Sequence, residues 1–444
     1  MSLSPEMLTV VMFSGLLIGL FMGHPLAFVL GGTAVIGAYL GPGERVLGTI
    51  INNIYGNSMD NYVLVAIPLF ILMARFLNDS SVTEKMFEAM RLLLANLRGG
   101  LALTVVIVSV LLAATTGIVG ASIAVMGLIA LAPMLKYGYH KGLSSGVIMA
   151  SGCLGILIPP SIMLILMASY SPVSVGALFA GALVPGLMLG AMYALYVLIA
   201  CFIKPAYGPK VPAEERSQVS TPQLLLMLAK YVLPPMALIL GVLGALFTGI
   251  ATATEASAIG VGIAFILFLT FGDRKIGTCF NTLLEAGKTT TMVMLVLVGA
   301  TAFTGVFSRG GGMQVINNIV LAMPGGTTGA LIAIFLLVFV LGMFLDWTGI
   351  VLLSFPIILP IVQQLGIDML WFVVMVAVVL QTSFLTPPFG YALFYLKGVA
   401  PAGVETLDLY KAVIPFVAII ILACILMSVF PQIITGLPSI LLNS

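Results

Sequence analysis

Residues 152–169, GCLGILIPPSIMLILMAS, are almost wholly apolar, yet two adjacent prolines stand in their middle. Pro159 and Pro160 lack backbone N–H groups, and their rings obstruct helical hydrogen bonding. The residue before each proline is also pushed out of the helical region. A continuous helix through this stretch is therefore excluded, and the sequence predicts a helix that is broken at its centre.

The composition around this break is that of a membrane protein. Of the 444 residues, 61% are hydrophobic and 7% are charged, whereas soluble domains carry about 25% charged residues. Long stretches contain no Asp, Glu, Lys or Arg, namely 7–43, 99–135, 142–203, 310–345, 369–396 and 412–444. A spanning helix needs about 20 apolar residues, so we expect an all-α polytopic protein with roughly ten or more membrane-embedded segments. A barrel would show alternating segments of about ten residues instead.

Several function classes find no support in the sequence. The four cysteines are scattered without metal-ligand spacing, and a net charge of +2 gives no sign of a nucleic-acid partner. The tripeptide at 287–289 matches the end of a phosphate loop, but Thr282 stands where that loop requires glycine. We therefore expect no enzyme, no catalytic residue and no organic cofactor.

The broken stretch has a counterpart in the second half of the chain. Pro387-Pro388 lies 228 positions after the first proline pair, and Gly325-Gly326 lies 226 positions after Gly99-Gly100. These offsets predict an internal duplication, in which each half contains spans, an interfacial helix, an apolar hairpin, a broken helix and a closing span. The amphipathic stretches 48–57 and 277–287 are the expected interfacial helices. Broken segments at matching positions of two halves indicate the binding site of a secondary transporter.

The apolar runs before the two breaks, 101–133 and 330–360, have small residues at their centres. Each arm beside such a centre has about 12–16 residues, which favours a re-entrant hairpin over one long kinked span with small residues for helix packing. Asp346 interrupts the second run, and acids inside apolar segments are commonly functional. It either binds a cation or accepts hydrogen bonds at a helix N-terminus. Glu255 is expected to cap or pack against the helix that follows it.

These segments resemble the large membrane subunit (DctM-like) of tripartite ATP-independent periplasmic (TRAP) transporters. The matching stretches, in family order, are AIPLFILMARFL (66–77), GGLALTVVIVSVLLAATTGIVGAS (99–122), APMLKYGYHKGLSSG (132–146), GILIPPSIML (155–164), GIATATEASAIG (249–260), GMFLDWTGI (342–350) and TPPFGYALFYLKG (386–398). They span nearly the whole chain, and their combination is specific although each piece alone is weak.

The resemblance implies Na⁺-coupled uptake of an organic acid anion by an elevator mechanism across the bacterial inner membrane. It implies two inverted repeats, a small four-helix membrane subunit as partner, and a periplasmic binding protein that delivers the substrate. The expected division is scaffold spans with an arm helix in 1–98, a first hairpin and broken helix in 99–170, linking spans, a cytoplasmic loop and the second scaffold in 171–324, a second hairpin and broken helix in 325–400, and a closing span in 401–444. The segments 99–170 and 325–400 form the transport domain.

The resemblance also places two Na⁺ sites, each between a hairpin tip and the following break. The first site is expected to be formed by Thr116, Gly117, Ser122, Gly155, Pro159 and Ser161. The second is expected to be formed by Gly342, Asp346, Thr348, Gly349, Ser383, Thr386 and Pro387. The substrate is expected between the two tips, with the hydroxyls of Ser122, Ser161, Thr348 and Thr386 as its contacts.

Two alternatives use the same broken helices. A single-component Na⁺/dicarboxylate elevator symporter would need no delivery protein. An ion channel would line a filter with the freed backbone, but it does not need two hairpin-and-break units in one chain.

Overall fold

The computed structural model describes residues 3–442 apart from 44, 118, 213–219, 274, 389 and 402, and it leaves the side chains of 45, 47, 49, 57, 58 and 114–116 undescribed. Within the described residues every regular element is helical. Eight helices there are long and apolar enough to cross a membrane, and shorter apolar helices accompany them. The predicted all-α polytopic class is therefore confirmed.

The first half of the chain contains a group of helices, a hairpin, a broken helix and a closing span. The first group is α1 (Pro5–Phe21), α2 (Leu26–Leu40), α3 (Arg45–Asn53), α4 (Ala66–Asp79) and α5 (Val82–Leu93). The hairpin comprises α6 (Gly100–Thr116), α7 (Val119–Met126) and α8 (Ala132–Lys136). The broken helix comprises α9 (Lys141–Cys153), a 3₁₀ turn (Leu154–Ile156) and α10 (Ile162–Tyr170), and α11 (Val175–Ile203) closes this half.

The second half repeats this order of elements. Its first group is α13 (Thr221–Tyr231), α14 (Leu233–Phe247), α15 (Ala253–Phe271), α16 (Ile276–Arg309) and α17 (Gly312–Leu321). The hairpin is formed by α18 (Gly326–Gly342) and α19 (Trp347–Gln364), and the broken helix by α20 (Met369–Leu385) and α21 (Tyr391–Val399). The last helices are α22 (Thr406–Val429) and α23 (Gln432–Leu442).

Both predicted breaks are present. The helix stops after Ile156 and restarts at Ile162, and in the second half it stops at Leu385 and restarts at Tyr391. Each proline pair lies within its interruption and has a cis peptide bond between the two prolines. The missing N–H groups and the restricted φ of proline explain why neither helix continues.

The predicted hairpins are also present, with longer arms than the sequence indicated. The Leu101 backbone N–H donates to the Tyr139 hydroxyl at 3.2 Å, which ties the start of the first hairpin to its end. α6 and α18 each have 17 residues, so each spans about 26 Å at 1.5 Å per residue. Small residues are compatible with a helix, and α6 therefore continues to Gly117, where φ of +58° ends it.

The second interfacial helix is not a separate element. Residues 277–287 form the first part of the 34-residue helix α16, which continues without interruption to Arg309. No proline lies in this stretch, and one interior glycine costs a helix only about 1 kcal/mol. The first amphipathic stretch, 48–57, falls in α3 and the π-helical turn Ile54–Met59 that follows it.

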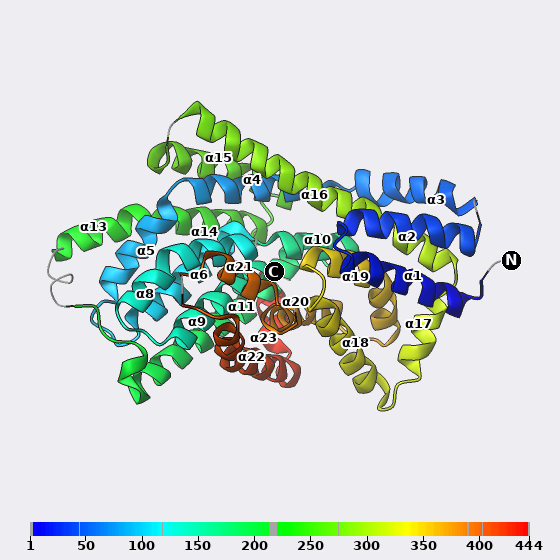
Figure 1. The fold of residues 1–444 in the computed structure, drawn as a ribbon. Coiled ribbons are helices and arrows are strands. Elements are labelled where there is room, and N and C mark those ends of the chain that lie inside the picture. Colours follow the sequence, from blue (N-terminus) through cyan, green and yellow to red (C-terminus); the bar gives the residue numbers. More distant parts are fainter. Residues whose placement is uncertain are drawn as a thin grey trace.

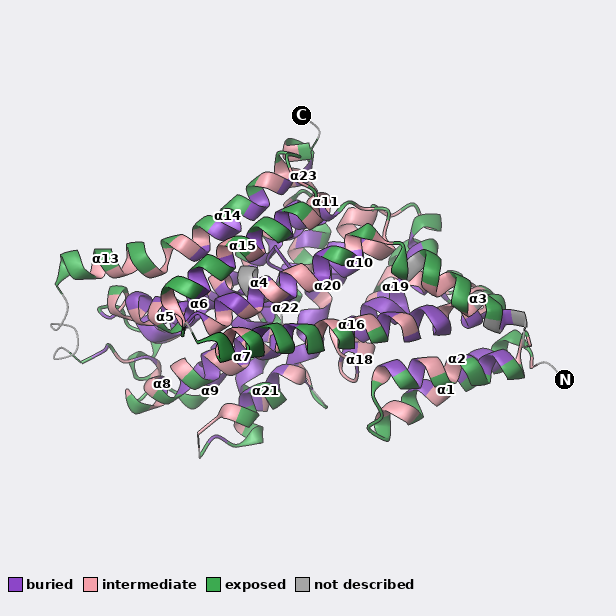
Figure 2. Cartoon of the chain, turned by 90° about the horizontal axis from the view of Figure 1, so that it is seen from above, coloured by how far each residue is buried: buried purple, intermediate pink, exposed green. Residues whose placement is uncertain are grey.

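The broken helices form the interior of the molecule. Every residue from 143 to 168 is buried, as is every residue from 372 to 385 except Val379. Figure 2 shows these buried segments at the centre, whereas α13 at the edge has no buried residue. A helix that is apolar on all faces is expected in such a position.

The two halves interlock through their second arms. Cβ atoms at Gly120 and Gly127 of the first hairpin segment would lie 2.5 Å from the Tyr395 ring and 2.6 Å from Val399 Cγ2, so this arm lies directly on α21. In the same way α19 of the second hairpin packs against α10. Each return arm thus contacts the broken helix of the opposite half, and both hairpins and both breaks meet at the centre of the molecule (Figure 1).

Candidate functional site

The tip of the first hairpin lies against the restart of the first broken helix. A Cβ atom at Gly117 would lie 3.2 Å from Ile162 Cγ1 and 3.3 Å from the Ile162 backbone nitrogen. The C-terminal end of α6 therefore approaches the N-terminal end of α10 at a distance that leaves little space for a side chain. This contact brings together the two windows in which the sequence placed the first ion site.

The first break is buried and internally hydrogen-bonded. Gly155, Pro159 and Ser161 are buried, and the Ser161 hydroxyl donates to the Ile156 carbonyl oxygen at 2.6 Å. A hydroxyl oxygen that donates in this way keeps its lone pairs free to accept a hydrogen bond or to bind a cation. Ser122 is buried on α7. The side chain of Thr116 lies outside the described residues.

The second hairpin and break are in equally close contact. A Cβ atom at Gly342 would lie 2.4 Å from Ser383 Cβ and 2.6 Å from Ser383 Oγ. Ser383 is fully buried, and its hydroxyl has no hydrogen-bond partner among the described residues. Thr386 donates its hydroxyl to the Thr382 carbonyl oxygen at 2.6 Å, whereas Pro387 is exposed. The end of α18 therefore contacts a buried hydroxyl that has no hydrogen-bond partner among the described residues.

Both isolated acids cap helices. Asp346 is the N-cap of α19, and its carboxylate accepts a hydrogen bond from the Gly349 backbone N–H at 3.1 Å. This is the second of the two roles considered for it, and it does not prevent the other carboxylate oxygen from binding a cation. Glu255 forms a capping box with Thr252, whose backbone N–H donates to Glu255 Oε2 at 2.8 Å. The expected capping role of Glu255 is confirmed.

A cavity of about 110 Å³ lies between the two hairpin tips. Both tips, both restarted helices, α4, α16 and the end of α20 contribute to its lining, which consists of Ile71, Val119, Gly120, Ile162, Thr289, Met292, Val293, Asp346, Trp347, Thr348, Phe384, Tyr391 and Tyr395. Of the four predicted substrate contacts, Thr348 lines this cavity, whereas Ser122, Ser161 and Thr386 are not among its lining residues. We refer to it as the central cavity.

The charge distribution of the central cavity arises mainly from helix ends. The first residues of α7, α10, α19 and α21, namely Val119, Ile162, Trp347 and Tyr391, are all in its lining. The unpaired N–H groups of a helix N-terminus carry about half a positive charge and bind anions readily. No Lys or Arg is among the described lining residues. The helix ends thus supply partial positive charge, and Asp346 is the one formally charged residue of the described lining.

Sequence reasoning did not identify the aromatic residues of this cavity or the lining residues on α4 and α16. Tyr391 and Tyr395 lie one turn apart on α21 and face the cavity, with the Tyr391 hydroxyl donating to the Phe344 carbonyl oxygen at 3.2 Å. Their spacing just after the break is a signal that could have been used.

Gln381 was also missed, although it is a lone amide in an apolar run. It is fully buried, and neither of its amide atoms has a partner among the described residues.

The contact at Gly342 leads to a testable prediction. Replacing Gly342 by alanine should destabilise the protein by about 1–3 kcal/mol, because the new methyl group overpacks a buried site. Thermal unfolding in detergent measures this change. The control Gly241→Ala adds a methyl group that meets nothing within 4 Å. The second substitution Ser383→Gly should restore stability to Gly342→Ala, and no rescue would show that this contact is not the cause.

Comparison with known proteins shows the family of the chain. Residues 13–433 match the family model of the tripartite ATP-independent periplasmic transporter, DctM component. The C4-dicarboxylate TRAP transporter large permease protein DctM of Pseudomonas aeruginosa is 31% identical over 86% of this chain and 87% of its own length. The protein of the same name in Vibrio cholerae is 30% identical over 96% of this chain and 97% of its own length.

Two further likenesses concern a longer relative and a solved structure. The sialic acid TRAP transporter permease protein SiaT of Haemophilus influenzae is 29% identical over 87% of this chain and 61% of its own length. The structure of the YdaH transporter of Alcanivorax borkumensis covers 96% of this chain and 98% of its own chain, with a TM-score of 0.60 at 15% identity. With a family match over nearly its whole length, the chain belongs to the DctM family of TRAP transporter large permeases, which are multi-pass proteins of the bacterial inner membrane.

Proposed function

We propose that this permease couples the uptake of an organic acid anion to Na⁺ by an elevator mechanism. The observation that carries the proposal is the central cavity between two hairpin tips, into which the N-termini of α7, α10, α19 and α21 converge. Relatives of this chain are named for C4-dicarboxylates and sialic acid, both of which carry carboxylates. A carboxylate is the group that such helix ends bind best.

The Na⁺ sites lie on the other side of each tip, where helix C-termini meet. α6 ends beside the first break, and α18 ends against Ser383 near the end of α20. The last carbonyl groups of a helix have no intrahelical partner, and Na⁺ is a hard cation that prefers oxygen ligands. The unpartnered hydroxyl of Ser383 and the lone pairs of Ser161 supply further oxygens. Gln381, buried two residues before Ser383, offers an amide oxygen.

Asp346 provides the coupling between the ion and the anion. Its carboxylate lies in the lining of the central cavity and repels a substrate carboxylate. A Na⁺ bound behind the second tip neutralises this charge, and the partly desolvated surroundings make the effect large. The ion therefore binds first and permits the anion to bind. A cavity that holds one carboxylate and no Lys or Arg among its described lining residues supports this order.

The packing of the elements supports an elevator mechanism. The two hairpins and the two broken helices interlock with one another, and α4 and α16 contribute the remaining wall of the cavity. The interlocked group is the moving domain, and α1, α2, α4 and α16 belong to the scaffold. A small four-helix membrane subunit steadies the scaffold, and a periplasmic binding protein delivers the substrate.

Reconstitution tests this proposal. Proteoliposomes with the permease and its small subunit should take up succinate or N-acetylneuraminate when an inward Na⁺ gradient and the cognate binding protein are both present. Replacing Na⁺ by K⁺, or omitting the binding protein, should lower the initial rate of uptake at least about tenfold. A factor of ten corresponds to a free-energy difference of about 1.4 kcal/mol. Uptake without the binding protein would favour a single-component symporter, and unsaturable flux indifferent to Na⁺ would identify a channel.

A further inference from the structure

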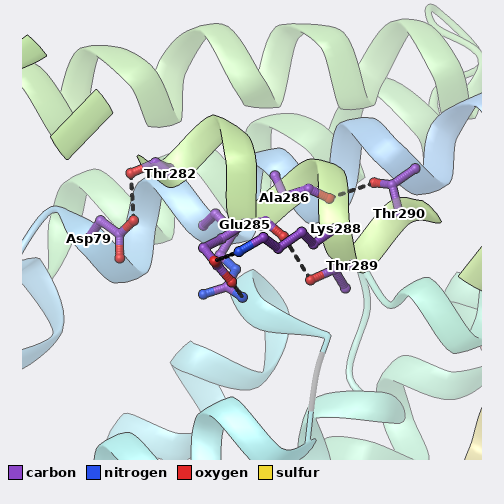
Figure 3. A network of polar contacts seen from close by, with 8 residues as sticks. Asp79, Thr282, Glu285, Ala286, Lys288, Thr289 and Thr290 are labelled. Carbon is purple, nitrogen blue, oxygen red and sulfur yellow. Dashed lines mark hydrogen bonds and ion pairs between the residues drawn. The ribbon is translucent and has the colours of Figure 1, made fainter. Parts of the chain in front are cut away.

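A group of charged side chains joins the scaffold helices α4 and α16. Arg75 on α4 forms an ion pair with Glu285 on α16, with 3.7 Å between Nη2 and Oε2. The Lys288 Nζ atom donates to the other oxygen of Glu285 at 2.8 Å. Figure 3 shows Glu285 bonded to Lys288, with Asp79 and Thr282 forming a separate pair farther along α16. We call Arg75, Glu285 and Lys288 the charged triad.

The charged triad lies one helical turn from the central cavity on both helices. Ile71 and Thr289 are in the cavity lining, and Arg75 and Glu285 are four residues away from them on α4 and α16. Residues four apart lie on the same face of a helix, about 6 Å along its axis. Arg75 and Glu285 therefore lie one turn beyond the cavity lining, at a position that we call its mouth. The side chains of the triad are accessible there, with exposures of 32% for Arg75, 45% for Glu285 and 62% for Lys288.

The guanidinium group of Arg75 has an N–H donor without an acceptor among the described residues. A guanidinium group has five N–H donors, yet the Arg75 Nε atom is buried and has no hydrogen-bond partner among the described residues. The distance of 3.7 Å to Glu285 is an ion-pair distance, too long for a hydrogen bond. The other nearby acid, Asp79, accepts the hydroxyl of Thr282 at 2.6 Å. A buried donor without an acceptor is costly, so this guanidinium is suited to bind an additional oxyanion.

The charges of the charged triad do not cancel. Arg75 and Lys288 carry two positive charges against the single negative charge of Glu285, which lies closer to Lys288 than to Arg75. Glu285 can therefore release Arg75 and remain paired. An accessible ion pair of this kind contributes little to stability, about 0–1 kcal/mol. Another carboxylate can therefore replace Glu285 on Arg75 without unfolding the protein.

We propose that Arg75 binds the carboxylate of the substrate at the mouth of the central cavity, and that Glu285 occupies its place between transport cycles. This inference rests on the proposed function, because it assumes that an organic acid anion passes this mouth. The planar fork of arginine matches a carboxylate with two parallel hydrogen bonds. The substrate anion exchanges with Glu285 on Arg75, Glu285 stays on Lys288, and no covalent bond is changed.

Chemical labelling tests the inference without a transport assay. The full-length permease with its small subunit is treated with phenylglyoxal, and modification of Arg75 is followed by mass spectrometry with Arg309 as an internal reference. Sodium succinate should slow the labelling of Arg75 relative to sodium chloride at equal ionic strength. Glu285→Gln should accelerate labelling and strengthen this protection, each about threefold or more, since charged hydrogen bonds are the strong ones. Labelling that responds to neither change, or to Glu285→Gln alone, would show a purely structural ion pair.

A transport assay separates this inference from the proposed function. In proteoliposomes Arg75→Gln should raise the KM for the transported anion about tenfold or more, and Arg75→Lys should recover only part of the loss because it lacks the fork. Lys275→Gln is the matched control, since Lys275 is 81% exposed beside α16 and pairs with Asp273 at 3.0 Å. Normal uptake by Arg75→Gln rejects the inference and leaves the proposed function intact. Wild-type protein that carries no anion rejects the proposed function, and the labelling result still decides whether Arg75 binds carboxylate.

Discussion

Replacement of Ser161 by leucine is expected to abolish Na⁺-dependent uptake, and Thr386→Leu is expected to have the same effect. Ser161 is fully buried in the first break, and its hydroxyl holds the loop by a 2.6 Å hydrogen bond to the Ile156 carbonyl oxygen. Leucine removes this bond and adds volume beside the contact between Gly117 and Ile162. Overpacking of this kind costs about 1–3 kcal/mol, and here it acts on the loop that holds the ion site.

The measurement has to separate loss of the site from loss of the fold. Binding of Na⁺ stabilises the folded state by mass action, so wild-type protein should unfold at a higher temperature in NaCl than in KCl. Both leucine variants should lose this difference while they remain monodisperse in detergent. Ser428→Leu is the matched control, because Ser428 is exposed on α22 within an apolar span. If both variants transport like the wild type, the assignment of the ion sites to the breaks is wrong.

The sequence was sufficient for those features that depend on local stereochemistry. Proline cannot donate a hydrogen bond and glycine tolerates positive φ. The two proline pairs therefore located the breaks, and Gly99 and Gly325, with φ of +75° and +94°, located the starts of the hairpins. The capping role of Glu255 was recognisable because its partner Thr252 lies three residues before it.

The sequence was not sufficient for features that depend on contacts between the two halves. Tyr395 lines the central cavity because the first hairpin packs on α21, where Gly120 leaves space for the tyrosine ring. The spacing of Tyr391 and Tyr395 puts both on one face of α21, but it does not indicate that this face meets the first hairpin. Thr289 contributes to the cavity because α16 continues straight through the stretch interpreted as an interfacial helix. The ends of the hairpin arms were misplaced for a related reason, since small residues permit both a helix and a turn.

The common logic of the site is the polarity of interrupted helices. A continuous helix has both charged ends at the membrane surfaces, whereas a broken helix has one C-terminus and one N-terminus inside. In this chain the first hairpin arms, α6 and α18, end beside the breaks, and the first residues of α7, α10, α19 and α21 line the central cavity. Each hairpin tip thus has carbonyl groups suited to a cation at the end of one arm and N–H groups suited to an anion at the start of the next. We propose that both kinds of site form in this charge-poor interior.

A cross-link between the scaffold and the second hairpin is expected to stop transport completely. Gly349, near the start of α19, lies against Leu26 at the start of α2, since a Cβ atom at Gly349 would be 2.3 Å from Leu26 Cδ2. Phe344 at the same tip stacks edge-on against Phe21 with ring centroids 5.6 Å apart. If the hairpins move as one body relative to α1 and α2, these contacts must separate in every cycle. The pair Leu26→Cys and Gly349→Cys, joined by Hg²⁺ or a short bifunctional maleimide, would then hold the carrier in one state.

The expected loss is more than about a hundredfold in uptake, because a covalent link removes a step of the cycle instead of slowing it. A reducing thiol should restore uptake after Hg²⁺ treatment, and each single-cysteine variant should keep its own untreated rate of uptake after the same treatment. The native Cys153 and Cys201 are buried, so the partly buried Cys279 and Cys424 are the ones replaced by serine first. Binding of succinate, followed by the fluorescence of Trp347 in a Trp371→Phe background, should survive the cross-link. Full transport by the linked protein would mean that the hairpin stays on α2 throughout the cycle, and the substrate would then have to pass through local opening of the tips instead of movement of the domain.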